Sequence, residues 1–222
     1  MPRQTYVLGR LFDIRVGVHV SWLAVYAFMT VALARAVGML PAAEAYAFGA
    51  LCAFTLFASV VAHEFAHALM ARRFGVRTNA ITLFLFGGVA TLEEEPASPR
   101  ADALIALAGP AMSALLALLA LAGVFIVDRV LGDGNLRDGV GLLGTYVFLA
   151  NAVLAVFNIV PAYPMDGGRV LRALFWHRSR DRVAATNVAS RIGIGFALLF
   201  VAAGVLVVAG THELVYGWYV LL

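Results

Sequence analysis

The 222-residue chain has few charges, one cysteine and no lysine. Charged residues make up 13% of the sequence, apolar residues make up 63%, and the mean hydropathy is +0.91. A soluble domain is usually about 25% charged and about 45–50% apolar, so this composition excludes an ordinary soluble protein and predicts a polytopic membrane protein. All 16 basic residues are arginine, and we infer no function from this bias.

The single cysteine, Cys52, lies inside an apolar run. One thiol cannot form a disulfide framework or a zinc site built from several thiolates. The net charge of +3 and the sequence pI of about 9.3 would suggest nucleic-acid binding in a soluble chain. Here the arginines cluster at the ends of apolar runs, which is typical of membrane topology, so we expect no nucleic-acid partner.

The long apolar runs predict an all-α membrane fold with about six transmembrane helices, since a span needs about 20 apolar residues. The predicted spans lie near residues 16–37, 45–71, 103–127, 140–161, 192–210 and 213–222. The last run is short, so a span there requires a tilted helix or a natural chain that continues beyond Leu222.

The segment between the second and third predicted spans, RTNAITLFLFGGVATLEEEP, does not have a helical pattern. It is rich in β-branched and aromatic residues and has Gly87 and Gly88 near its middle, which predicts a short β-hairpin or small sheet. Nonhelical backbone near a membrane must lie against protein or a water-filled cavity. The acidic run that follows, Glu93–Glu95, is interpreted as a solvated loop.

The arginine distribution orients the predicted spans. If successive spans cross the bilayer in alternate directions, 13 of the 16 arginines fall on one side, and only Arg35, Arg129 and Arg137 fall on the other. The positive-inside rule assigns the arginine-rich side to the cytoplasmic face of the cell membrane.

The second predicted span contains the pattern His-Glu-x-x-His, formed by His63, Glu64 and His67. On a helix, residues i and i+4 lie one above the other with Cβ atoms about 5–6 Å apart, so both imidazoles could bind one tetrahedral Zn²⁺. Glu64 points about 100° away, where it could contact a metal-bound water. Ionisable residues in a bilayer cost about 2.5–3.5 kcal/mol each, which favours a functional site over buried polar residues satisfied by neighbouring helices. The nearby basic end at Arg72 places this site toward the cytoplasmic side of the bilayer.

A second polar segment, FNIVPAYPMDGGRVLRALF, follows the fourth predicted span. Asp166 lies between Pro164, which breaks the helix, and Gly167, which permits tight backbone packing. Asp166 could be a third metal ligand or the N-cap of the following helix, and spacing alone leaves both open. Asn158 could cap a helix, pack against a neighbour or hydrogen-bond a substrate.

Two features of the third predicted span have simpler interpretations. Asp102 lies at its start, after Ser-Pro-Arg, where capping a helix is a sufficient explanation. We therefore expect Asp102→Ala to leave metal binding intact. Gly109 and Pro110 are interpreted as residues that begin the helix and allow it to pack closely against its neighbours.

Four segments together, HEFAH, GGVA, AGPAMSALLA and NIVPAYPMDGGRVLRA, resemble the site-2 protease family of intramembrane zinc metalloproteases over nearly the whole chain. The resemblance implies that His63, His67 and Asp166 bind one zinc ion and that Glu64 is the general base. It also implies that Asn158 engages the substrate backbone. The family's hairpin, here around Ile81–Leu92 with Gly87 and Gly88, would offer an edge strand to the substrate.

The resemblance further implies one transmembrane protease domain over residues 1–222, with its catalytic core near 45–175. Its expected activity is cleavage of a partner's transmembrane segment, as the second cut in regulated intramembrane proteolysis. The expected partners are a membrane protein with a transmembrane helix and the lipid bilayer. No stretch is similar to the PDZ insert of many members. Members without it often carry nucleotide-binding CBS domains, so such a module is expected if the natural chain continues.

Two rival interpretations come from other classes. A metal transporter or sensor could use the same ligands, but it has no need of Glu64 beside them and usually has ionisable groups at several depths. An inactive relative that only binds membrane helices is disfavoured, because every expected catalytic residue is present.

Overall fold

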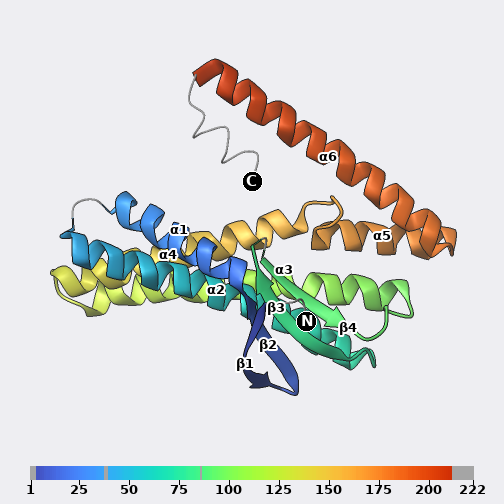
Figure 1. The fold of residues 1–222 in the computed structure, drawn as a ribbon, viewed down its shortest axis with the longest axis horizontal. Helices are drawn as coiled ribbons and strands as arrows, with labels where there is room; N and C mark the ends of the chain where they lie inside the picture. Colours follow the sequence, from blue (N-terminus) through green and yellow to red (C-terminus); the bar gives the residue numbers. More distant parts are fainter. Residues whose placement is uncertain (1–3, 38–39, 86, 212–222) are drawn as a thin grey trace.

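The computed structural model describes residues 4–37, 40–85 and 87–211. The helices are α1 (Val20–Ala36), α2 (Ala42–Arg73), α3 (Pro99–Val130), α4 (Asn135–Ile159), α5 (Asp166–Ser179) and α6 (Arg182–Thr211). The strands are β1 (Thr5–Leu11), β2 (Ile14–His19), β3 (Thr78–Phe84) and β4 (Gly87–Leu92). Helices α1 to α4 run side by side, and α6 extends away from them in contact with α5 (Figure 1).

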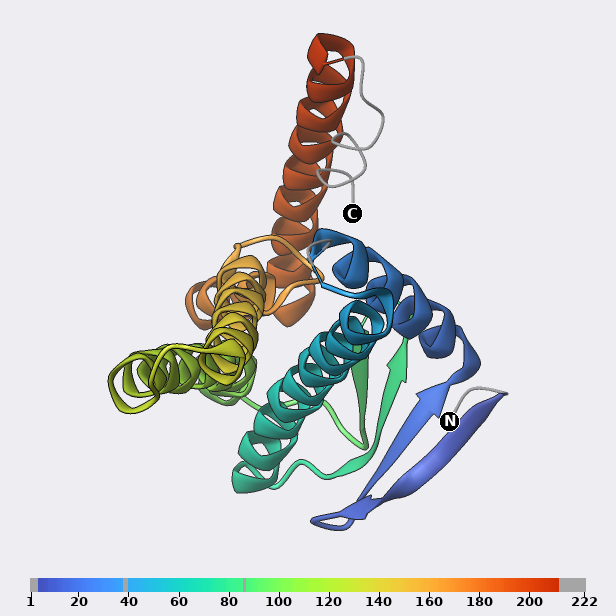
Figure 2. The same ribbon diagram turned by 90° about the vertical axis from the view of Figure 1, so that its left-hand side faces the viewer.

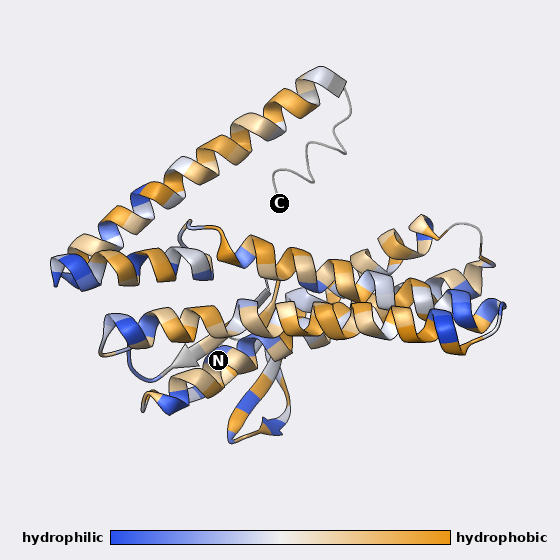
Figure 3. Cartoon of the chain, turned by 180° about the vertical axis from the view of Figure 1, so that it is seen from behind, coloured by the Kyte–Doolittle hydropathy of each residue, from blue (hydrophilic) through white to orange (hydrophobic). Residues whose placement is uncertain are grey.

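The long helices have the dimensions and surface of membrane spans. Among the described residues, four segments are long and apolar enough to cross a membrane: α2, α3, α4 and Arg182–Val207 of α6. Apolar residues cover most of their length, and polar residues gather toward the helix ends (Figure 3). The predicted polytopic membrane fold is therefore confirmed, whereas the predicted run at 213–222 lies outside the described residues.

The helix in the first predicted span, 16–37, is shorter than expected, because the start of this segment forms a strand. Strand β2 pairs antiparallel with β1 and parallel with β3, which gives one sheet in the order β1-β2-β3-β4. Helix α1 starts only at Val20, where the His19 side chain accepts a hydrogen bond from the Ser21 N–H, and it has 17 residues. The sequence predicted the β3–β4 hairpin but not β1 and β2, because an apolar strand leads directly into an apolar helix.

Helix α2 lies between the sheet and α3 (Figure 2). Its sheet side is held by a buried cluster of Ile14, Phe65, Ala68 and Ile81. The helix ends at Arg73, and Gly75 follows with a φ of +78°, a conformation that favours glycine. The middle of α2 is therefore enclosed by protein on two sides, although the helix has the length of a membrane span.

The chain turns sharply between α4 and α5. A Cβ atom on Gly167 would collide with the carbonyl oxygens of Ile159 and Val160, and one on Gly168 would collide with the backbone of Tyr163. Only glycine allows the first turn of α5 to pack this closely on the preceding loop. The turn places Asp166, the first residue of α5, opposite the histidines of α2.

Candidate metal centre

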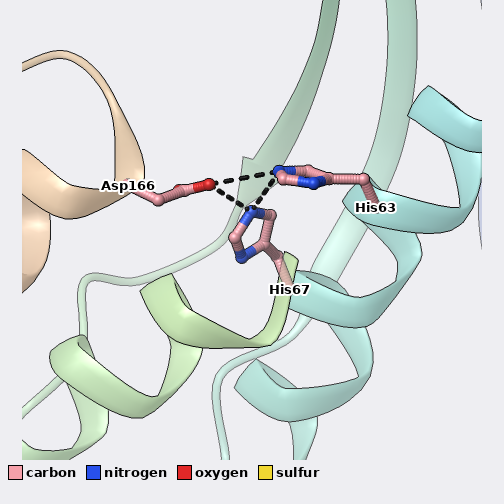
Figure 4. Close-up of side chains that lie close together, drawn as sticks. All are labelled: His63, His67 and Asp166. Atoms are coloured by element: carbon pink, nitrogen blue, oxygen red, sulfur yellow. Dashed lines mark hydrogen bonds and ion pairs between the residues drawn. The ribbon is translucent and has the colours of Figure 1, made fainter. Parts of the chain in front are cut away.

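His63 and His67 of α2 face Asp166, the first residue of α5 (Figure 4). Asp166 Oδ2 lies 3.1 Å from Nε2 of each histidine, and the two Nε2 atoms are 3.1 Å apart. The three residues are buried, with exposures of 4%, 6% and 8% for His63, His67 and Asp166. Within the described ranges, no other three His, Cys, Asp or Glu residues form such a group.

This triangle of donor atoms fits a zinc ion. Tetrahedral ligands about 2.0–2.1 Å from Zn²⁺ are separated from one another by about 3.3 Å, close to the separations found here. Burial raises the pKa of the Asp166 carboxyl, but its contacts with His63 and His67 lower the pKa by more, to about 2. The carboxyl is therefore ionised, as a metal ligand must be.

Helix α3 orients both imidazoles through contacts with their Nδ1 atoms. His67 Nδ1 lies 2.7 Å from the Ile105 carbonyl oxygen, and His63 Nδ1 lies 2.9 Å from Ser113 Oγ. A carbonyl oxygen only accepts hydrogen bonds, so Nδ1 of His67 donates, which leaves Nε2 as the ring nitrogen that can bind a metal ion. Outer hydrogen bonds of this kind fix the tautomer and the ring orientation of metal-binding histidines.

Gly109 lies on the same face of α3, halfway between Ile105 and Ser113. A Cβ atom here would be 2.5 Å from His63 Nε2 and closer still to His67 Nε2. Any other residue would therefore displace α3 or the two ring nitrogens. The predicted packing role of Gly109 is thus confirmed, but its role in starting the helix is wrong, because α3 begins ten residues earlier, at Pro99.

The seven predicted site residues all line one cavity of about 570 Å³. They are His63, Glu64, His67, Gly87, Gly88, Asn158 and Asp166. Glu64 reaches from α2 to β4, where a Cβ atom on Gly88 would be 2.5 Å from Glu64 Cγ. Asn158 Nδ2 donates to the Leu154 carbonyl oxygen at 2.9 Å. A second cavity of about 580 Å³, beside the end of α2 and the β1–β2 turn, contains none of the seven.

Two capping interpretations are wrong. The N-cap of α3 is Ser98, whose side chain accepts from the Ala101 N–H, and the fully buried Asp102 carboxylate pairs with Arg172 of α5 instead. The N-cap position of α5 is Met165, so Asp166 is free to face the histidines.

The sequence interpretation missed the contributions of α3 to the site. The available signal was the four-residue spacing of Ile105, Gly109 and Ser113, which places them on one helix face.

The chain is similar to known proteins in sequence and in fold. Residues 51–130 and 134–202 match the profile of Peptidase family M50. The chain is 36% identical over 224 residues to a protein of Synechocystis sp. named as a zinc metalloprotease, and 38% identical over 230 residues to Rip3 of Mycobacterium tuberculosis, which is named likewise. The alignments cover 96% and 98% of this chain but 57% of each relative, so the chain spans little more than half their length.

A solved structure has a similar arrangement of elements. The site-2 protease from Methanocaldococcus jannaschii matches with a TM-score of 0.66 and 28% sequence identity. The match covers 98% of this chain and 92% of that chain.

Proposed function

Because this chain belongs to peptidase family M50, we propose that it is a zinc endopeptidase that cleaves within or beside a transmembrane segment of a membrane-protein substrate. The proposal is carried by the triangle of His63, His67 and Asp166, with Glu64 lining the same cavity. The names of the relatives and the similarity to a site-2 protease support the same activity. We treat residues 1–222 as one protease domain.

Glu64 is the proposed general base. Zinc held by the two histidines and Asp166 would supply a Lewis acid that activates water and stabilises negative charge on the substrate carbonyl oxygen. Glu64 follows His63 directly in α2 and lines the same cavity, so it can accept the proton of the attacking water. The same carboxyl can then donate that proton to the leaving amine.

Strand β4 is the proposed binding site for an unwound substrate. A helical substrate must unwind first, because its carbonyl groups are occupied by internal hydrogen bonds. In the described sheet β4 is an edge strand, so its unpaired side can bind an extended peptide by strand addition. Gly87 and Gly88 line the cavity beside Glu64, and we assign Asn158, on the same cavity, to the substrate backbone.

The proposed active site lies within the cell membrane, toward its cytoplasmic side. His63 and His67 lie near the end of α2 that carries Arg72 and Arg73, which supports this orientation by the positive-inside rule. The family resemblance supports the second cut in regulated intramembrane proteolysis as the role. A nucleotide-binding CBS module is part of the proposal only for a natural chain that continues beyond Leu222.

Glu64→Gln in the purified, reconstituted protein tests this function. We expect about one zinc per chain by elemental analysis in both wild type and variant. Cleavage of a transmembrane reporter should fall by at least about 10²-fold in the variant, because general acid–base catalysis typically contributes about 10²–10⁴-fold. Glu44→Gln, at the exposed start of the same helix, is the matched control and should retain both properties.

Three outcomes would count against the proposal. Wild type without zinc would exclude a zinc enzyme, and a fully active Glu64→Gln variant would exclude Glu64 as the base. Zinc flux into liposomes without any cleavage would indicate a transporter instead.

A further inference from the structure

A buried ion pair joins α3 to α5 next to the candidate metal centre. Arg172 Nη2 donates to Asp102 Oδ1 and Oδ2 at 2.7 and 2.6 Å, and Arg172 Nε donates to Oδ2 at 2.9 Å. Asp102 is 0% exposed and Arg172 is 7% exposed. Such a buried carboxylate requires a close partner, because an isolated charge is strongly disfavoured away from water.

Arg169 connects this pair to Asp166. Its Nη2 lies 3.4 Å from Asp102 Oδ1, and its Nη1 lies 3.8 Å from Asp166 Oδ1. The other oxygen of Asp166, Oδ2, is the atom that faces both histidines. The two oxygens of the candidate ligand therefore have different partners, and one of them is a guanidinium shared with Asp102.

We propose that Asp102 is a positioning residue for the metal ligand Asp166, an inference that rests on the proposed function. Asp102 fixes α5 against α3 through Arg172, and α5 begins at Asp166. The Asp102 carboxylate also partly neutralises the positive charge of Arg169. Without Asp102, Asp166 is the carboxylate left beside Arg169, and the guanidinium would compete with the metal for it.

Asp102→Asn tests this role, because it keeps the side-chain shape and removes the charge. Zinc affinity should be measured by competition with a chelator in the full chain. The visible absorption spectrum of the cobalt-substituted protein should be recorded as well, since it reports the geometry of the ligands. We expect affinity to fall by about 10-fold, the lower end of the range for removing a direct outer partner of a metal ligand, because Asp102 acts on Asp166 through Arg169 and Arg172. We also expect the cobalt spectrum to change.

Glu95→Gln is the matched control. It removes the ion pair between Glu95 and Arg182, whose atoms are 2.5 Å apart and which joins the loop after β4 to α6. Because neither Glu95 nor Arg182 is among the residues that line the cavity, zinc affinity and the cobalt spectrum should remain those of wild type.

The double variant Asp102→Asn/Arg172→Gln separates positioning from folding. Removing both partners avoids an unpaired buried guanidinium, so thermal stability should recover relative to Asp102→Asn. Zinc affinity should stay low, because neither α5 nor Arg169 is held as before. Wild-type affinity and spectrum in Asp102→Asn would overturn the inference, and so would full recovery of affinity in the double variant. Zinc-free wild type would instead refute the proposed function itself.

Discussion

The two halves of α3 have opposite surroundings. Residues 99–113 bury several polar or small side chains against α2 and α5, including Asp102, Gly109 and Ser113. In residues 115–130 most large apolar side chains are exposed, among them Leu118 at 62% and Ile126 at 60%. The first half contacts the candidate metal centre, and the second has the apolar exterior that a bilayer requires.

Helix length alone does not distinguish these halves, but the burial of their residues does. Helix α3 as a whole is long and apolar enough to cross a membrane. A buried polar residue on such a helix has a protein partner, whereas an exposed leucine needs only lipid. The position of each residue relative to α2 therefore determines what a substitution will do.

Gly109→Ala should have the largest effect of any single methyl group added to α3. The new Cβ atom would overlap the space of both histidine Nε2 atoms, so we expect loss of measurable zinc binding and of proteolysis. Gly123→Ala in the second half is the matched control, because a Cβ atom there has no neighbour within 4 Å. Elemental analysis and reporter cleavage on both variants would test this, and a zinc-loaded, active Gly109→Ala protein would contradict it.

Ser113→Ala should have an intermediate effect. It removes the hydroxyl that lies 2.9 Å from His63 Nδ1 but leaves the ligand triangle in place. We expect zinc affinity to fall by about 10-fold, at the lower end of the range for outer hydrogen bonds, because His67 keeps its own partner. The control is Thr145→Ala, whose hydroxyl donates only within α4, to the Gly141 carbonyl oxygen. Equal affinity in the two variants, by chelator competition, would show that Ser113 does not orient the ring.

The parts of the fold that depend on local sequence could be predicted. Apolar length identified α2, α3, α4 and α6, and glycines with β-branched residues identified the β3–β4 hairpin. The N-terminal strands could not be predicted in the same way, because β2 pairs in parallel with β3 across more than sixty residues of chain. Such pairing is determined by tertiary contacts, and no turn residue separates β2 from α1 to mark the boundary.

The same distinction applies to the site: features set by local sequence could be predicted, and features set by tertiary packing could not. His63 and His67 are four residues apart on one helix, so their common direction follows from helix geometry alone. Asp166 could be suggested by the helix breaks around it, but its choice between capping and facing the histidines depends on how α5 packs. The contacts of Gly109 and Asp102 depend wholly on the packing of α3 against α2 and α5. The helix-start interpretation of Gly109 and the capping interpretation of Asp102 failed for this reason.

The smallest effect is expected for Ile105→Val, which distinguishes the packing of the Ile105 side chain from the contact that its backbone makes with His67. Ile105 is 1% exposed, yet its contact with His67 is made by its backbone carbonyl oxygen. Ile105→Val should therefore retain zinc affinity and lower the free energy of unfolding by about 0.5–1.5 kcal/mol, the usual result of removing one buried methyl group. Leu118→Val, at an exposed position in the second half, should change it by less than about 0.5 kcal/mol. Denaturant titration in detergent micelles would measure both values. Equal losses would show that α3 is packed along its whole length, and reduced zinc affinity in Ile105→Val would show that the side chain, and not only the backbone, supports His67.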